Sequence, residues 1–468
     1  MVAIITDNFK RKFIDQIITD VGTTSGYYVA IGRSEDWDSS DTVPNPTNSL
    51  AEQRRFRESM QSVKLGEDVS YVIPRNNWSS GTTYDSYDDA VAGYPTNAYY
   101  VITDELQVYI CLQQGRNTSG VSVPSSIKPT GTLLEPQTKS DGYVWRYLYS
   151  LSAGRATKFQ SSNYTPVEFI DSSADPAGFT TQQAEQRNIQ YAAIRGEVTD
   201  VVVTAGGSGY TSVPTVTITG LQNTYDSAGL APKTATATAV VNGGTIVDIK
   251  MDDSGTGKAF GRGYVFADVD ISGGGGSGAI ARAVLAPVRG IGGDPRDDLR
   301  STALMFNCKT DGAEGNTFVV GNDFRQVALI RNPRIGPDSD AASFTGNSAN
   351  TLKTLKLAAG GATFAPDKTI LGASSGAKAF IDKVDSDRIY FHQTTETGFT
   401  PFQEAETISE TDGAGTGTLD SAGADVDTRA FDSADIDLSS GEILYIDNRA
   451  AITRSAAQQE DFKIIIQL

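Results

Sequence analysis

The chain has 468 residues, and its 57 acidic and 39 basic side chains give it a formal net charge of −18. A surface this acidic repels phosphate groups, which argues against general binding to nucleic acid and to anionic membranes. Hydrophobic residues make up 39% of the chain and charged residues 21%, a balance that permits globular cores rather than disorder. The length predicts two to four folding units.

The cysteine content and the first residues bear on the cellular compartment. Cys111 and Cys308 are the only cysteines, too few for a disulfide framework in so long a chain. The opening MVAIITD lacks a basic region followed by an apolar core, and no run of about twenty apolar residues occurs. We therefore expect a cytoplasmic chain without an export signal or a membrane-spanning helix.

Residues 1–195 mix helical and strand patterns. Apolar residues at helical spacing predict an amphipathic helix capped by Asp7. The capping-box sequence SLAE at 49–52 predicts a second helix with Phe56, Met60 and Val63 on its inner face. The apolar residues of the first helix are Phe9, Phe13, Ile14, Ile17 and Ile18. Further expected elements are strands at 27–31, 69–73 and 143–151, a hairpin of 99–103 with 107–112, and a helix at 180–190.

A degenerate repeat built from Gly, Ala, Thr and Val occupies 196–287. GEVTDV at 196–201 is echoed by GTIVDI at 244–249, and ATATAVV at 235–241 by AIARAVL at 279–285. The middle of each copy is also repeated: GY at 209–210, followed by VTITG ending at 220, is echoed by GY at 263–264, followed by VDISG ending at 273. Each copy supplies three strands and their turns, which predicts a small all-β insert.

A second β-repeat insert is predicted at 358–425, where FAPDKTI before SGA is matched by FQEAETI before GAGTG. The chain ends with two strand patterns, 441–452 and 461–468, separated by a polar turn, and we expect these two strands to pair. The predicted fold is mainly β: a layered antiparallel β-sandwich core with a few peripheral helices and two repetitive all-β inserts. The core comprises 1–195, 288–357 and 426–468, interrupted by the inserts at 196–287 and 358–425.

The residue types that carry catalysis are few. His392 is the only histidine, which excludes a multi-histidine zinc site within one chain, and its sequence context favours a structural role. Cys111 and Cys308 lie in apolar runs and are interpreted as core residues. We therefore expect no catalytic residue, no metal, no cofactor and no small-molecule substrate.

Three weaker patterns have bland explanations. The run GGGGSG at 273–278 lacks the Lys-Ser/Thr ending of a phosphate-binding loop and is interpreted as a turn between strands. DDSG at 252–255 lacks the full spacing of a calcium loop. Two acidic clusters with aromatic neighbours could line a sugar groove, but acidic loops explain them equally. These clusters are Asp36 and Asp38 beside Trp37, and Asp85, Asp88 and Asp89 with Tyr84 and Tyr87.

Five sequence blocks, in order, resemble the baseplate wedge subunit encoded by gene eight of T-even-type contractile-tail bacteriophages. The blocks cover parts of the three core segments and leave out both inserts. They are GRSEDW (32–37) with PNPTNS (44–49), VIPRNNW (72–78) with TYDSY (83–87), DGYVWRYLY (141–149), FRQV with IRNP (324–333), and 441–468.

This resemblance implies a structural virion protein rather than an enzyme: a homodimer that binds other baseplate wedge subunits and is assembled in the bacterial cytoplasm. Nothing is carried over from the family to the two inserts. Residues within the blocks are expected to anchor cores or subunit interfaces, and plain core packing is the alternative for each. They are Trp37, Trp78, Trp145, Tyr143, Phe324, Tyr445 and Arg449.

Two other functions stay open at this point. The repeated inserts and the tyrosines would also suit a receptor-binding or glycan-binding tail protein. A tail polysaccharide depolymerase would require one pair among the 57 acidic residues to be catalytic.

Overall fold

The computed structural model describes residues 3–23, 26–38, 40–66, 68–223, 231–254, 257–336, 342–358, 363–421, 431–432 and 434–468. Strands account for 41% and helices for 13%, so the predicted mainly β fold with several antiparallel sheets is confirmed. None of the helices within these ranges is both long and apolar enough to span a bilayer.

The chain divides into two compact units. Unit 1 contains Met1–Asp15, Ser70–Met305 and Ile465–Leu468, and unit 2 contains Gln16–Val69 and Phe306–Ile464. The chain therefore enters each unit more than once, and both units draw on the first 195 residues. The boundaries predicted for the core segments and the inserts stay predictions.

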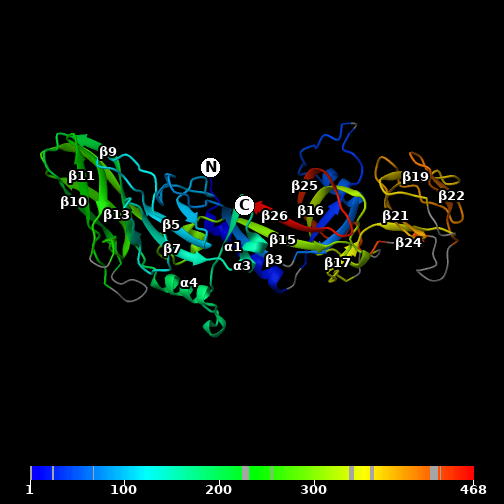
Figure 1. The fold of residues 1–468 in the computed structure, drawn as a ribbon, viewed down its shortest axis with the longest axis horizontal. Coiled ribbons are helices and arrows are strands. Elements are labelled where there is room, and N and C mark those ends of the chain that lie inside the picture. Colours follow the sequence, from blue (N-terminus) through cyan, green and yellow to red (C-terminus); the bar gives the residue numbers. More distant parts are fainter. Residues whose placement is uncertain are drawn as a thin grey trace. The chain divides into compact units, whose positions relative to one another are not determined.

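In unit 1, a four-stranded antiparallel sheet has the order β4-β5-β7-β6, and its two central strands, β5 and β7, are labelled in Figure 1. The predicted hairpin is present as β4 and β5, and α4 lies against β7. Thr180 and Gln183 form a capping box at the start of α4, because each side chain bonds the backbone N–H of the other residue. The elements are β3 (Asp68–Pro74), β4 (Tyr100–Ile102), β5 (Gln107–Gln113), β6 (Gln137–Thr138), β7 (Val144–Ser150), α3 (Ala153–Phe159), β8 (Tyr164–Val167), a 3-10 turn (Pro176–Gly178), α4 (Thr181–Ala192) and α5 (Pro295–Asp298).

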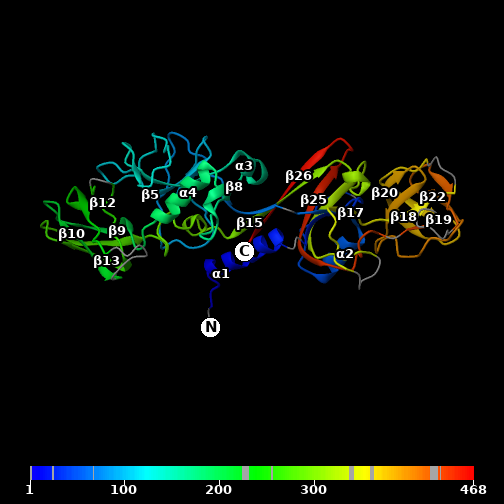
Figure 2. The same ribbon diagram turned by 90° about the horizontal axis from the view of Figure 1, so that it is seen from below.

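The repeat at 196–287 forms six strands of unit 1. Three antiparallel pairs, β9–β14, β10–β13 and β11–β12, form separate two-stranded sheets, and β9 lies next to β12, β13 next to β14, and β10 next to β11 (Figure 2 labels β9, β10, β12 and β13). The four glycines of GGGGSG form the predicted turn between β13 and β14, and the following Ser277 and Gly278 begin β14. The strands are β9 (Val198–Ser208), β10 (Thr215–Gln222), β11 (Ala237–Asn242), β12 (Thr245–Met251), β13 (Tyr264–Ser272) and β14 (Ser277–Leu285).

The two copies of this repeat share one strand register. Val284 lies opposite Asp200 in β14–β9, and the equivalent Val240 lies opposite Asp248 in β11–β12. Both ladders shift by one residue directly after that valine. The repeated sequence therefore builds two equivalent halves, down to the position of a β-bulge.

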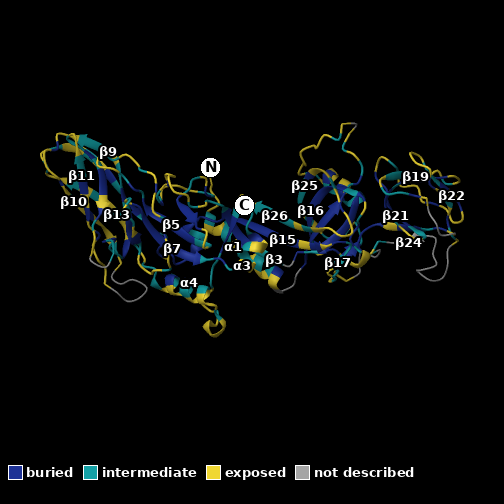
Figure 3. Ribbon diagram, in the orientation of Figure 1, coloured by how far each residue is buried: buried dark blue, intermediate teal, exposed yellow. Residues whose placement is uncertain are grey.

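In unit 2, a five-stranded antiparallel sheet has the order β17-β2-β1-β16-β25. Its central strands are the most buried, as the dark ribbon of β16 in Figure 3 illustrates. The elements are β1 (Tyr27–Gly32), α2 (Leu50–Glu58), β2 (Met60–Leu65), β15 (Ala303–Asp311, which begins in unit 1), a 3-10 turn (Glu314–Asn316), β16 (Asp323–Arg331), β17 (Ser348–Asn350) and β25 (Glu442–Thr453).

The two predicted N-terminal helices differ in detail from expectation. In α1 (Asp7–Thr23), Asp7 is the first helical residue, and Phe9 and Phe13 are 65% and 54% exposed. In α2, Ser49 accepts the Glu52 N–H as predicted. However, placing Met60 and Val63 on this helix was wrong: α2 ends at Glu58, and both residues belong to β2. Their spacing from Phe56 fits a helical period, but β1 offers an antiparallel partner that a strand can pair with.

The second repeat supplies β19 to β23 of a seven-stranded sheet in unit 2, which β18 and β24, just outside the predicted insert, complete in the order β23-β22-β19-β20-β21-β18-β24. The repeated strands β19 and β22 pair with each other, and Phe364, Phe402, Ile370 and Ile408 share one core. The strands are β18 (Lys353–Lys356), β19 (Lys368–Gly372), β20 (Lys378–Asp385), β21 (Arg388–His392), β22 (Thr407–Glu410), β23 (Thr416–Thr418) and β24 (Phe431–Asp432).

The expectation that the last two strands pair with each other was wrong. β25 pairs with β16, whereas β26 (Gln459–Gln467) lies in a different sheet. Within unit 2, the Thr310 hydroxyl on β15 donates to Glu460 on β26 at 2.7 Å. A polar turn shows that the chain reverses, but it does not determine which strand each arm will meet.

Candidate functional site

The predicted anchors of unit 1 form one aromatic cluster. Trp145 and Tyr143 are fully buried, with their rings stacked 5.7 Å apart, and Tyr84 meets Trp145 edge-on at 5.6 Å. Trp78 is half-buried, and its indole N–H donates to the Ser125 hydroxyl at 3.2 Å. These residues pack the core around β5 and β7, so in the isolated chain their contacts are internal.

The predicted anchors of unit 2 lie in two places. Phe324 is buried against Phe462, with ring centroids 6.1 Å apart. Trp37, half-buried, donates its indole N–H to the carbonyl oxygen of Arg449 at 2.8 Å, which joins the first and last resemblance blocks. Tyr445 is half-buried and the Arg449 side chain is exposed.

Trp37 contacts β25, an edge strand of the five-stranded sheet. β25 is the terminal strand of the five-stranded sheet and runs for 12 residues. Leu444 is 48% exposed, Arg449 is exposed, and Tyr445 is half-buried. Edge strands leave backbone N–H and C=O groups unpaired, so they are ready templates for pairing with another chain.

The two acidic clusters considered as sugar sites are engaged by arginines. Asp36 accepts a hydrogen bond from Arg325 at 2.6 Å, and Arg325 is itself buried. Asp88 and Asp89 both pair with Arg282 of β14. The aspartates of both clusters therefore join segments that are distant in sequence, because the arginines that they bond lie about 200 or more positions away.

The aspartates of the DDSG sequence, which the structure describes up to Ser254, also bond other side chains. Asp253 pairs with Lys258 at 2.9 Å, and Asp252 accepts the Thr238 hydroxyl at 2.7 Å. Across the part of the chain that the structure describes, no three His, Cys, Asp or Glu side chains are grouped to hold a metal ion.

His392 lies in a buried array that sequence reasoning missed. Its Nδ1 is 2.6 Å from Asp382 on β20, and its Nε2 is 3.2 Å from Glu35 in the loop after β1. Asp382 also accepts the Gln61 amide at 3.0 Å, and Phe380 stacks on the imidazole ring. Glu35 lies 357 positions from His392, so no local pattern could have identified this pairing.

The array fixes the charge of the imidazole. Burial alone would lower the pKa of His392, but the facing carboxylates of Asp382 and Glu35 outweigh it and raise the pKa to about 10. Burial would raise the pKa of Glu35, but His392 and then Arg33 lower it overall. His392 is thus an imidazolium at neutral pH, with both ring N–H groups donated to carboxylates.

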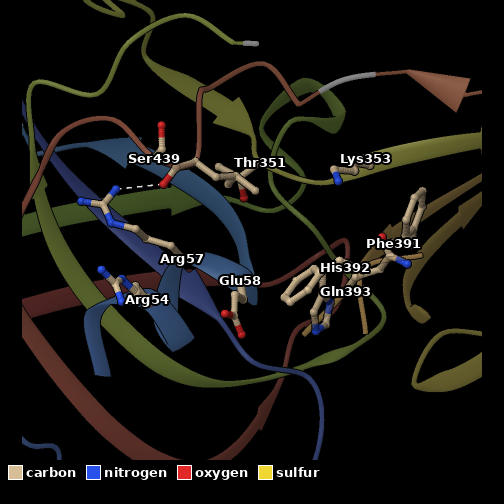
Figure 4. A pocket seen from close by; sticks show the side chains of 11 residues that line it. Arg54, Arg57, Glu58, Thr351, Lys353, Phe391, His392, Gln393 and Ser439 are labelled. Carbon is tan, nitrogen blue, oxygen red and sulfur yellow. Dashed lines mark hydrogen bonds between the residues drawn. The ribbon is translucent and has the colours of Figure 1, made fainter. Parts of the chain in front are cut away.

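A pocket of about 280 Å³ in unit 2 lies beside this array (Figure 4). Arg54, Arg57 and Glu58 of α2 line one side, and Lys353, the first residue of β18, lines the other, as Figure 4 shows. The apolar part of the lining is Phe391, Phe399 and Leu438. This pocket, concave and rich in cations on an acidic protein, is the best candidate for a ligand site.

The cysteines match the prediction of core residues, since Cys111 and Cys308 are both buried. Burial raises the pKa of the Cys111 thiol well above its usual value, which disfavours the reactive thiolate. Comparison of the sequence with protein-family models and with curated proteins gives no match.

Proposed function

We propose that this protein is a structural, non-enzymatic subunit of the baseplate wedge of a contractile-tail bacteriophage. In this role it is a homodimer that binds other wedge subunits in the virion and uses no cofactor. The proposal is supported by the five ordered sequence blocks, and it agrees with the mainly β fold of both units.

The structural observation that carries the proposal is that β25, in the last resemblance block, is the terminal strand of its sheet among the described residues. Trp37 occupies the carbonyl oxygen of Arg449 on this strand. Leu444, Tyr445 and Arg449 combine an apolar, an aromatic and a guanidinium side chain along this edge. Aromatic and arginine side chains are enriched at subunit interfaces, and an open edge can extend its sheet with a neighbour's strand. We place the dimer contact here.

A second exposed apolar surface suits an assembly of several subunits. At the N-terminus, Ile4, Ile5, Phe9 and Phe13 are between 54% and 85% exposed. Clustered apolar exposure of this kind marks interaction sites more often than free surface. A subunit that must bind several neighbours needs more than one such surface.

The chemistry of the buried groups favours a non-catalytic role. His392 is held as an imidazolium between two carboxylates, so at neutral pH it has no lone pair with which to act as a base. The thiol of Cys111 is buried and has a raised pKa. The chain's one histidine and the Cys111 thiol are therefore engaged in internal contacts.

The proposal is tested by antibody labelling of intact virions, read by electron microscopy. Label on the plate at the end of the tail is the expected result. Label on fibre tips would refute the wedge assignment and favour receptor binding. If no label binds, peptide mass spectrometry of digested virions decides: absence of the protein's peptides refutes the proposal, and their presence supports a buried virion subunit.

The dimer contact is tested on the purified chain by sedimentation velocity. Leu444→Lys places a charge on the exposed edge of β25 and is expected to weaken dimerisation at least about tenfold. Leu134→Lys is the matched control, because Leu134 is similarly exposed, at 45%, in unit 1 and lies outside both β25 and the 196–287 segment. Equal effects of the two substitutions, or a wild-type monomer at every concentration, would refute the placement.

A further inference from the structure

The pocket beside His392 carries an excess of positive charge. Arg54, Arg57 and Lys353 line it, and Glu58 is the one carboxylate in its lining. His392 also lines the pocket, but Asp382 and Glu35 offset its charge. This excess occurs on a chain whose net charge is −18, so the pocket differs in sign from the average surface.

Most polar groups of the pocket are already engaged by the protein. Arg57 donates to the carbonyl oxygens of Leu438, at 2.9 Å, and of Gly441, at 2.7 Å. The Gln393 amide donates to two carbonyl oxygens, each at 2.9 Å, and the Thr351 hydroxyl donates to the carbonyl oxygen of Met60. These side chains shape the pocket and offer few further donors.

Two cations remain available to a ligand. Within the described residues, the side chains of Arg54 and Lys353 have no hydrogen bond or ion pair, and both residues are exposed. One oxygen of Glu58, by contrast, accepts both the backbone N–H and the hydroxyl of Thr395. A ligand carboxylate would therefore meet free cations at the side walls of the pocket.

The rest of the lining is apolar. Phe399 is 57% exposed at the pocket, whereas Phe391 is buried in its wall. Leu438 is half-buried and completes the apolar lining. An apolar ligand group that covers Phe399 removes apolar surface from water, which favours binding.

We infer that this pocket binds a segment of a partner protein that presents one carboxylate next to an apolar side chain, such as an apolar C-terminal residue. Arg54 or Lys353 takes the carboxylate, and Phe399 and Leu438 cover the apolar group. The choice of a protein as the source rests on the proposed role as an assembly subunit. A sugar acid carries the same carboxylate, but its hydroxyls would find few free partners, because Gln393, Thr351 and Arg57 are engaged.

The test measures binding to the purified full-length chain by ligand-observed saturation-transfer NMR. Three probes are compared: the peptide acetyl-Gly-Gly-Leu with a free carboxylate, the same peptide as its C-terminal amide, and glucuronate. We expect the free acid to bind at least about tenfold more tightly than the amide, because charge-assisted hydrogen bonds depend on the carboxylate. Glucuronate is expected to bind more weakly than the peptide acid.

Matched variants locate the binding. The double variant Arg54→Ala/Lys353→Ala is expected to lose most of the affinity for the peptide acid. The control Arg55→Ala/Lys378→Ala removes the same charge from exposed positions on α2 and β20 outside the pocket, and it should bind as the wild type does. Phe399→Ser should weaken binding of the peptide acid.

Equal binding of acid and amide, equal loss in both double variants, or no detectable binding of the peptide acid would overturn the inference. Tighter binding of glucuronate than of the peptide acid would also overturn it, in favour of an acidic glycan. Since this assay uses no virions, it can fail while antibody labelling still places the protein on the baseplate, and the reverse is equally distinguishable.

Discussion

Replacing His392 with glutamine should destabilise unit 2 strongly. The imidazolium lies between Asp382 and Glu35, and glutamine keeps a polar side chain of similar reach but no charge. The variant leaves two buried carboxylates facing each other without the cation that separates them. Removing one partner of a buried ionic array costs about 3–5 kcal/mol for this reason.

The pKa of His392 gives an independent magnitude. A rise from the ordinary 6.5 to about 10 corresponds to roughly 5 kcal/mol of preferential stabilisation of the imidazolium by the folded chain. The side chain is 4% exposed, so solvent screening reduces this value little. Both routes therefore predict a loss of several kcal/mol, a large share of the stability of an ordinary domain.

The sign of the pH dependence follows from the same shift. Because the folded pKa exceeds the unfolded one, the stabilisation by His392 is complete below pH 6.5 and is lost as the pH rises towards about 10. Between pH 6.5 and 9.5, the difference in unfolding free energy between wild type and His392→Gln should therefore shrink steadily.

Hydrogen exchange of β20 and β21 measures this locally, which avoids assuming that two units unfold in one step. Asp385→Asn is the control, because it changes a 50% exposed carboxylate on β20, the strand that carries Asp382. It should alter protection by less than about 0.5 kcal/mol. A loss below about 1 kcal/mol for His392→Gln, or a difference that does not change with pH, would refute this account of the array.

Two further predictions concern other buried charges. Burial raises the pKa of Asp200 to about 7, so its ionisation opposes folding as the pH rises from 3.8 through 7. The protection of β9 and β12 from hydrogen exchange, corrected for intrinsic rates, should therefore fall between about pH 5.5 and 8. Asp200→Asn should reduce this fall. An unchanged pH dependence in the variant would contradict the assignment. Arg454→Met should cost about 3–5 kcal/mol in urea unfolding, because the fully buried guanidinium bonds Glu460 and the carbonyl oxygens of Val319 and Gly312. Arg289→Met, which removes a half-exposed arginine paired with Asp294, should change stability by less than about 1 kcal/mol, and comparable losses in the two variants would refute the argument.

Local features were the ones that the sequence predicted well. Ser49 caps α2 as expected, because a cap needs only residues within one turn. The repeats were also visible, since two copies carry the same pattern of apolar residues and turns. The helix predicted to continue to Val63 failed because positions 56, 60 and 63 fit a helix, and only the partner strand β1 decides otherwise.

The candidate site could not be predicted, because its parts are distant in sequence. The pocket combines α2 with β18, β21 and the segment before β25. The array beside it joins Glu35, Asp382 and His392. Arg454 is a similar case: in a polar turn it is expected at the surface, yet the fold buries it completely. Burial of a charged residue depends on partners that no local window contains.

The equivalent halves of the 196–287 segment have a consequence for how two molecules could interact. The two halves are β9–β11 and β12–β14. Strand β10 pairs with its counterpart β13, and β9 lies beside its counterpart β12, so each half binds the other through equivalent strands. Such self-complementarity means that one half is already built to associate with a copy of itself, as in a symmetric dimer. Two chains that opened between β11 and β12 could exchange halves and re-form every pairing between molecules, which makes this segment the natural place for domain swapping at high concentration.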